Sequence, residues 1–162
     1  MAELTPRGRF ADAMVRIPVT WVFVLTYLAG IALERAVHPG RFVGDYRLPT
    51  PAGPVVFALG AALAAWGWFL FERRQTTKVP GEVSTTLVTS GPYRFTRNPM
   101  YVGLTLAYLG EAAMLHQIAP VILLPLTIVY LNMVVIPLEE ERLGAVFGED
   151  YARYQNRVRR WL

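Results

Sequence analysis

The chain contains no cysteine, and only two of its 162 residues are histidines, His38 and His116. The absence of cysteine excludes disulfides, thiolate metal sites and a catalytic thiol. Because both histidines fall in predicted loops, we expect no metal site. Charged residues make up only 17% of the chain, and no internal repeat or low-complexity segment is visible. Neither a thiol-based nor a metal-based active site is therefore expected.

Apolar residues are abundant instead, at 54% of the chain, and they occur in long blocks. A helix needs roughly 20 apolar residues to cross the hydrocarbon core of a membrane. The blocks predict four transmembrane helices, at about residues 17–36, 54–71, 99–115 and 118–137. The third and fourth are either two upright spans or one tight hairpin. We therefore expect an all-α integral membrane protein, with one domain over residues 1–162.

The basic residues predict an orientation in the membrane. They gather before the first predicted span, between the second and third, and after the fourth. By the positive-inside rule, both termini and the long central loop are cytoplasmic. The net charge is +4, but cationic groups at membrane edges favour contact with anionic lipid. We therefore expect no nucleic acid as a partner.

A first motif lies at the entry to the third predicted span, in the segment SGPYRFTRNPMYVG over residues 90–103. Asn98 and Pro99 predict a helix start, since Asn is a favoured N-cap and Pro suits the first helical position. The positive end of such a helix binds anions, and Arg94 and Arg97 add donors for a carboxylate. Tyr101 follows Arg97 by four residues and lies on the same helix face. The alternative is an ordinary interfacial anchor of aromatic and basic residues.

A second motif follows the fourth predicted span, which we expect to end at Pro137. Three acids, Glu139, Glu140 and Glu141, come directly afterwards. They either complement the dipole of a new helix or bind a cationic ligand. Further along, Tyr151 belongs to the apolar face of a short amphipathic helix, typical of a segment in the headgroup layer.

The two motifs, in this order, resemble those of the isoprenylcysteine carboxyl methyltransferase and phospholipid methyltransferase group of membrane enzymes. The resemblance covers roughly residues 88–162 and implies S-adenosylmethionine as the cofactor. Asn98 stands where that group usually has His, so a proton-accepting role of the histidine is absent here. The resemblance implies that catalysis involves Arg94, Tyr101 and Glu140. It implies cofactor contacts from Tyr93, Arg97, Asn98, Pro99, Tyr101, Gly103, Glu139, Glu140 and Tyr151.

The resemblance implies methyl transfer to an amphiphilic acceptor at the cytoplasmic membrane face. That acceptor is either a phospholipid amine or an isoprenylcysteine-like carboxylate. Two alternatives stay open: a membrane reductase with a nicotinamide cofactor, and a small membrane subunit without catalysis. The acidic pair Glu139 and Glu140 favours a cationic cofactor over a dinucleotide rich in phosphate.

Overall fold

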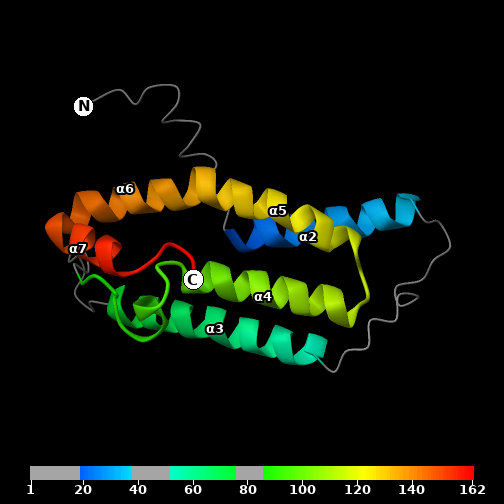
Figure 1. Ribbon diagram of the computed structural model, residues 1–162, viewed down its shortest axis with the longest axis horizontal. Helices are drawn as coiled ribbons and strands as arrows, with labels where there is room; N and C mark the ends of the chain where they lie inside the picture. The colour runs from blue at the N-terminus through cyan, green and yellow to red at the C-terminus, as the bar shows by residue number, and fades with distance from the viewer. Residues whose placement is uncertain (1–18, 38–51, 76–85) are drawn as a thin grey trace, which may run out of the picture. The chain divides into compact units, whose positions relative to one another are not determined.

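The computed structural model describes residues 19–37, 52–75 and 86–162 (Figure 1). Over these ranges the chain forms helices, turns and irregular segments and no strand, which confirms the predicted all-α class for the described part. The chain divides into two compact units. One comprises Met1–Leu48 and Leu115–Glu139, and the other Pro49–Met114 and Glu140–Leu162.

The first unit is built on an antiparallel pair, α2 (Val19–Val37) and α5 (Ala119–Tyr130). A β-carbon on Gly30 would lie 2.5 Å from the Cα atom of Pro120, so the two backbones are in close contact there. Thr127 donates a hydrogen bond of 2.9 Å to the Thr26 hydroxyl. At the end of α2, Glu34 accepts a bond of 3.4 Å from the first amide of α5. Small and hydroxyl-bearing residues thus join two otherwise apolar helices.

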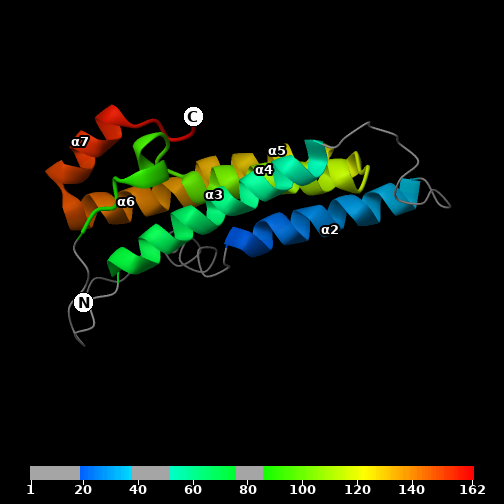
Figure 2. The same ribbon diagram turned by 90° about the horizontal axis from the view of Figure 1, so that it is seen from below.

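The second unit contains the antiparallel pair α3 (Ala52–Gln75) and α4 (Pro99–Met114), which Figure 2 shows from below. Glycines on α3 recur every seven residues and face the glycines of α4. A β-carbon on Gly103 would lie 2.7 Å from the Gly60 oxygen, and one on Gly110 would lie 2.3 Å from the Phe57 nitrogen. Only glycine permits this backbone approach.

Three helical stretches, rather than four, are long and apolar enough to cross a membrane within the described residues: Val19–Val37, Ala52–Arg73 and Ala119–Phe147. The third predicted span forms α4, whose 16 residues extend only about 24 Å. The hydrocarbon core is about 30 Å thick. The helix stops at Met114, and a positive φ of 54° at His116 follows. The prediction of four full-length spans is therefore corrected to three candidates, with α4 paired along α3.

The helix does not end at Pro137, where the fourth span was predicted to end. Helix α5 continues through a π-helical turn, η2 (Leu131–Val135), into α6 (Ile136–Phe147). A proline inside an α-helix removes one hydrogen bond, and its ring collides with the carbonyl four residues earlier. The wider π turn directly before Pro137 moves that carbonyl aside, so the helix continues. The three acids consequently lie inside a helix rather than at the start of a new one.

The chain reverses at Gly148, where φ is +52°, and enters α7 (Glu149–Arg157). Left-handed backbone favours glycine, which has no β-carbon. Helix α7 buries Tyr151 and Tyr154 and exposes its charged residues, so the predicted amphipathic helix is confirmed. Residues 158–162 then run beside the turn that precedes α4 (Figures 1 and 2).

Candidate functional site

The first motif forms a short 3-10 helix, η1 (Gly91–Arg94), followed by the start of α4. Gly91 has a φ of +62°, and Tyr93 is buried beneath the turn, where its hydroxyl donates to the Gly67 oxygen at 3.4 Å. The first helical bond of α4 runs from the Val102 amide to the Asn98 oxygen at 3.1 Å. The predicted helix start at Asn98 and Pro99 is confirmed.

The two motifs meet at an ion pair. Arg97, from the turn before α4, places Nη1 3.2 Å from Oε1 of Glu140 on α6. Arg160 reaches the same carboxylate with two nitrogens: Nε lies 3.1 Å from Oε1 and Nη2 lies 2.6 Å from Oε2. The Glu140 side chain is only 15% exposed. Burial leaves these charge-assisted bonds less screened than bonds on an open surface. We call Arg97, Glu140 and Arg160 the charge cluster.

Arg97 has donor capacity that the charge cluster leaves unused. Its Nε and Nη1 atoms are buried and form no hydrogen bond with any described residue, although Nη1 lies within ion-pair distance of Glu140. A buried donor without a hydrogen bond costs roughly 1–3 kcal/mol. Such groups are rare in native proteins and call for an explanation. An anion, such as a carboxylate, would satisfy the Nε donor.

Two tyrosines of α7 lie next to the charge cluster. Tyr151 and Tyr154 are buried, with ring centroids 6.2 Å apart, and the Tyr154 hydroxyl donates to the Tyr93 oxygen at 2.8 Å. Burial raises the pKa of the Tyr151 hydroxyl, and the Glu140 charge raises it further, against the opposing effect of Arg97. Burial likewise raises the pKa of Tyr154. Both phenols therefore remain neutral at physiological pH.

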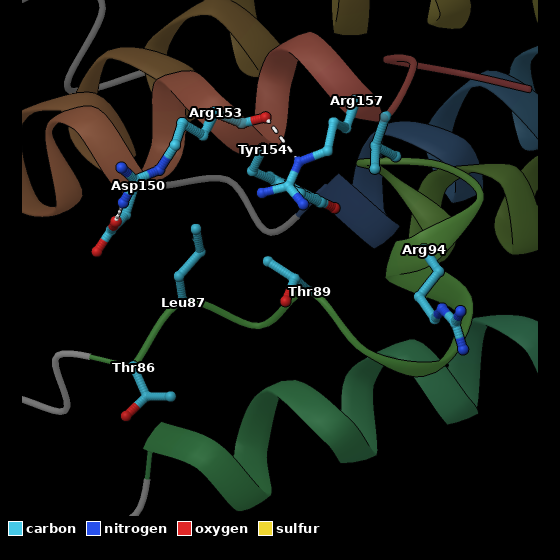
Figure 3. A pocket seen from close by; sticks show the side chains of 9 residues that line it. Thr86, Leu87, Thr89, Arg94, Asp150, Arg153, Tyr154 and Arg157 are labelled. Carbon is cyan, nitrogen blue, oxygen red and sulfur yellow. Dashed lines mark hydrogen bonds and ion pairs between the residues drawn. The ribbon is translucent and has the colours of Figure 1, made fainter.

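Tyr154 also lines an open groove of about 660 Å³ (Figure 3). Leu87 and Thr89 approach it from the segment before η1, while Arg153 and Arg157 extend from α7 opposite them. Arg153 forms an ion pair with Asp150, so the charge of Arg153 is already balanced. The complete lining is Thr86, Leu87, Thr89, Arg94, Asp150, Arg153, Tyr154, Arg157 and Val158. Three arginines against one aspartate make the groove basic.

The residues singled out in the sequence fall into three sets. Arg97, Glu140 and Tyr151 come together around the charge cluster, and Asn98 adjoins them through its bond to Arg160. Arg94 is exposed and lines the groove instead. The other predicted residues of the second unit are buried within it: Tyr93, Pro99, Tyr101 and Gly103. Glu139 belongs to the first unit.

Sequence reasoning missed Arg160 and Thr96. The Thr96 hydroxyl donates to the main-chain oxygen of Arg160 at 3.1 Å and accepts a hydrogen bond from the main-chain amide of Asn98. Arg160 belongs to a basic C-terminal run that resembled an interfacial anchor. The available signal was the combination of a lone acidic cluster with this basic run 20 residues later.

Residues 49–150, more than half of the chain, match the family described as phospholipid methyltransferase. The chain is also 38% identical over 145 residues to the cobalt-zinc-cadmium resistance protein CzcN of Cupriavidus metallidurans, covering 88% of this chain and 61% of that protein. It is 38% identical over 77 residues to the nickel-cobalt-cadmium resistance protein NccN of Alcaligenes xylosoxydans xylosoxydans, covering 46% of this chain and 36% of that protein.

The chain thus spans less than two thirds of either relative. No solved structure matches it. Although both relatives are named for metal resistance, the described residues contain no group of three or more His, Cys, Asp or Glu side chains that could hold a metal ion. The family match extends the sequence resemblance toward the N-terminus, from residue 88 to residue 49, and so includes α3. This chain belongs to the phospholipid methyltransferase family.

Proposed function

We propose that this protein transfers a methyl group from S-adenosylmethionine to an amphiphilic acceptor embedded in the membrane, at the cytoplasmic face. Membership of the phospholipid methyltransferase family supports the reaction class. The observation that carries the proposal is the meeting of both motifs at the charge cluster, where Arg97 keeps buried donors without a hydrogen bond beside the carboxylate of Glu140.

The charge cluster fits the amino-acid end of the donor. That end carries a carboxylate and an ammonium group on one carbon atom, and the cluster sets an arginine beside a glutamate. Nε of Arg97 would bind the carboxylate, and Glu140 would bind the ammonium group. Both Glu140 oxygens already accept hydrogen bonds from arginine. We therefore assign Glu140 to binding rather than to proton transfer.

The basic groove fits the head of the acceptor. Both candidate acceptors carry an anion near the group to be methylated: a phosphate in a phospholipid amine, or the carboxylate itself in an isoprenylcysteine. Arg94 and Arg157 would bind that anion, and Leu87 and Val158 would contact the start of the apolar tail. Bound donor supplies a methyl group on a positively charged sulfur, so the residues mainly align the two reactants.

Calorimetry on the detergent-purified protein tests the proposal with S-adenosylmethionine, S-adenosylhomocysteine and NADPH. We expect both adenosyl compounds to bind and NADPH not to bind. Binding of NADPH alone would overturn the proposal in favour of a reductase, in which the groove arginines would hold the pyrophosphate. Binding of none of the three would favour a membrane subunit without catalysis.

A matched pair of variants locates the site. Arg97→Gln removes the buried guanidinium, and Arg94→Gln removes an exposed one three residues earlier. We expect Arg97→Gln to weaken S-adenosylhomocysteine binding about 10- to 150-fold, the range for a hydrogen bond to a charged group. Arg94→Gln should leave that affinity unchanged and reduce only turnover. Equal affinities in the two variants would mean that the donor does not bind at the charge cluster.

A further inference from the structure

The C-terminal segment, residues 158–162, is fastened to the first motif through its main chain. The Arg97 amide donates to the Arg159 oxygen at 2.9 Å. Two side chains, Thr96 Oγ1 at 3.1 Å and Asn98 Nδ2 at 2.9 Å, donate to the Arg160 oxygen. Three hydrogen bonds thus fix the segment immediately beside Arg97.

This attachment brings the Arg160 side chain onto Glu140. Its guanidinium binds both carboxylate oxygens, while 36% of the side chain remains exposed. A guanidinium presents positive charge and N–H donors, which are the groups that an ammonium ion also presents to a carboxylate. Arg160 therefore supplies Glu140 with the interactions that a cationic ligand would make. The bond to Glu140 raises the pKa of Arg160, so this cation persists at physiological pH.

Arg97 is inaccessible to a ligand while the segment is attached. The two guanidinium atoms without a hydrogen bond, Nε and Nη1, each have less than 1 Å² of accessible surface. A ligand carboxylate cannot reach atoms that are sealed in this way. Arg160 lies on the same carboxylate as Arg97 and has more than twice the exposure, at 36% against 13%. Arg160 is therefore the arginine of the charge cluster that lies nearer to solvent, and it can leave Glu140 without moving the buried Arg97.

We propose that Arg160 is an internal ligand of Glu140 that an incoming α-amino-acid group displaces, so that the C-terminal segment opens when the methyl donor binds. This inference rests on the proposed function. The bound donor replaces the Arg160 guanidinium by its ammonium group on Glu140, and its carboxylate accepts a hydrogen bond from Nε of Arg97. In protein without donor, Arg160 binds both oxygens of Glu140, whereas Arg97 lies at ion-pair distance from Oε1.

The affinity test compares Arg160→Gln with Arg159→Gln by calorimetry. The Arg159 side chain is exposed, and its main-chain oxygen, which Arg97 uses, survives substitution. Two probes are titrated: S-adenosylhomocysteine, which has the α-amino-acid group, and methylthioadenosine, which lacks it. We expect Arg160→Gln to bind S-adenosylhomocysteine roughly 5- to 20-fold more tightly than wild type, between the values for exposed and buried charged bonds. Methylthioadenosine affinity, and both affinities of Arg159→Gln, should stay at the wild-type level.

A second measurement follows the segment itself. The chain has no native cysteine, and Leu162 is 76% exposed, so Leu162→Cys accepts a spin label at one site. We expect saturating S-adenosylhomocysteine to increase the mobility of that label, and methylthioadenosine not to change it. Arg160→Lys keeps the charge but cannot bind Glu140 through two nitrogens. Without ligand, the label mobility in this variant should lie between those of ligand-free and ligand-saturated Arg160 protein.

Three results would overturn the inference. Weaker S-adenosylhomocysteine binding in Arg160→Gln would mean that Arg160 positions Glu140 for the donor instead of competing with it. Equal binding in wild type and variant, or a label that stays immobile when the ligand binds, would mean that the segment does not open. In these cases the proposed function still stands. Failure of wild type and Arg160→Gln alike to bind S-adenosylhomocysteine would remove both proposals together.

Discussion

The side-chain amide of Asn98 donates a hydrogen bond of 2.9 Å to the main-chain oxygen of Arg160, 62 residues later in the chain. This bond links the helix start of the first motif to the C-terminal segment. The side-chain amide of Asn98 needs no change of protonation to donate this bond. The residue therefore has a clear positioning role that does not involve proton transfer.

Substitution of Asn98 by Ala should loosen the C-terminal segment. The loss of one neutral hydrogen bond corresponds to about 0.5–1.5 kcal/mol, or about a 2- to 12-fold larger opening constant. Amide hydrogen exchange of a peptide covering residues 158–162 measures this change. Asn156→Ala is the control, because Asn156 is exposed on α7 of the same unit. Equal exchange in the two variants would contradict the positioning role of Asn98.

Substitution of Gly103 by Ala should separate α3 from α4. The new β-carbon would lie 2.5 Å from the Ala64 nitrogen and 2.7 Å from the Gly60 oxygen, both of them main-chain atoms. We expect a loss of about 1–3 kcal/mol in the free energy of unfolding, typical of an overpacked site. Thermal melting in detergent measures the effect.

Gly144→Ala provides the opposite case within α6. The nearest atom to its β-carbon would be 3.9 Å away, on the Tyr151 ring. Because Ala favours helix by up to about 1 kcal/mol over Gly, this variant should melt at the same or a higher temperature than wild type. A lower melting temperature for Gly144→Ala than for Gly103→Ala would contradict the close pairing of α3 and α4.

Alkaline pH should destabilise the packing of α7. Burial raises the pKa of Tyr151 and Tyr154 above the ordinary value of 10.0. Below pH 10 both phenols are neutral in the folded and unfolded states, so their packing contributes fully to the free energy of unfolding. Above pH 10 the unfolded state loses protons first, and stability falls by up to about 1.4 kcal/mol per pH unit for each tyrosine. Urea unfolding at rising pH measures the free energy of unfolding, which should decline less steeply in the Tyr151→Phe/Tyr154→Phe double variant than in wild type. An equal decline in both proteins would contradict the attribution of the pH effect to these tyrosines.

Membrane orientation can be tested with single cysteines. Asn156 and Ile118 are both exposed, and they belong to α7 and to the turn before α5. The positive-inside rule predicts that Asn156→Cys is labelled by an impermeant reagent only from the cytoplasmic side and Ile118→Cys only from the opposite side. Labelling of Asn156→Cys from outside the cell would reverse the proposed orientation.

Features that depend on neighbouring residues could be predicted from the sequence. Asn98 and Pro99 do begin a helix, because cap and proline preferences act within one turn. The amphipathic pattern around Tyr151 likewise predicted α7 correctly.

Features that depend on distant residues could not be predicted. The partners of Glu140 come from 43 residues earlier and 20 residues later, and no local pattern connects them. The same distance hid the role of Thr96. Pro137 misled in another way: proline usually ends a helix, but the π turn before it, which the sequence does not announce, lets the helix continue.

Methyl transfer itself tests the central claim most directly. Purified protein in detergent is incubated with S-adenosylmethionine labelled in its methyl group and with a bacterial lipid extract, and the label in the organic phase is counted. Wild type and Glu141→Gln, whose substituted side chain is exposed, should transfer label equally at subsaturating donor. Glu140→Gln should transfer about 10- to 150-fold less, since it loses a charged bond to the donor. Equal transfer by Glu140→Gln and Glu141→Gln, or no labelled lipid with wild type, would contradict the account.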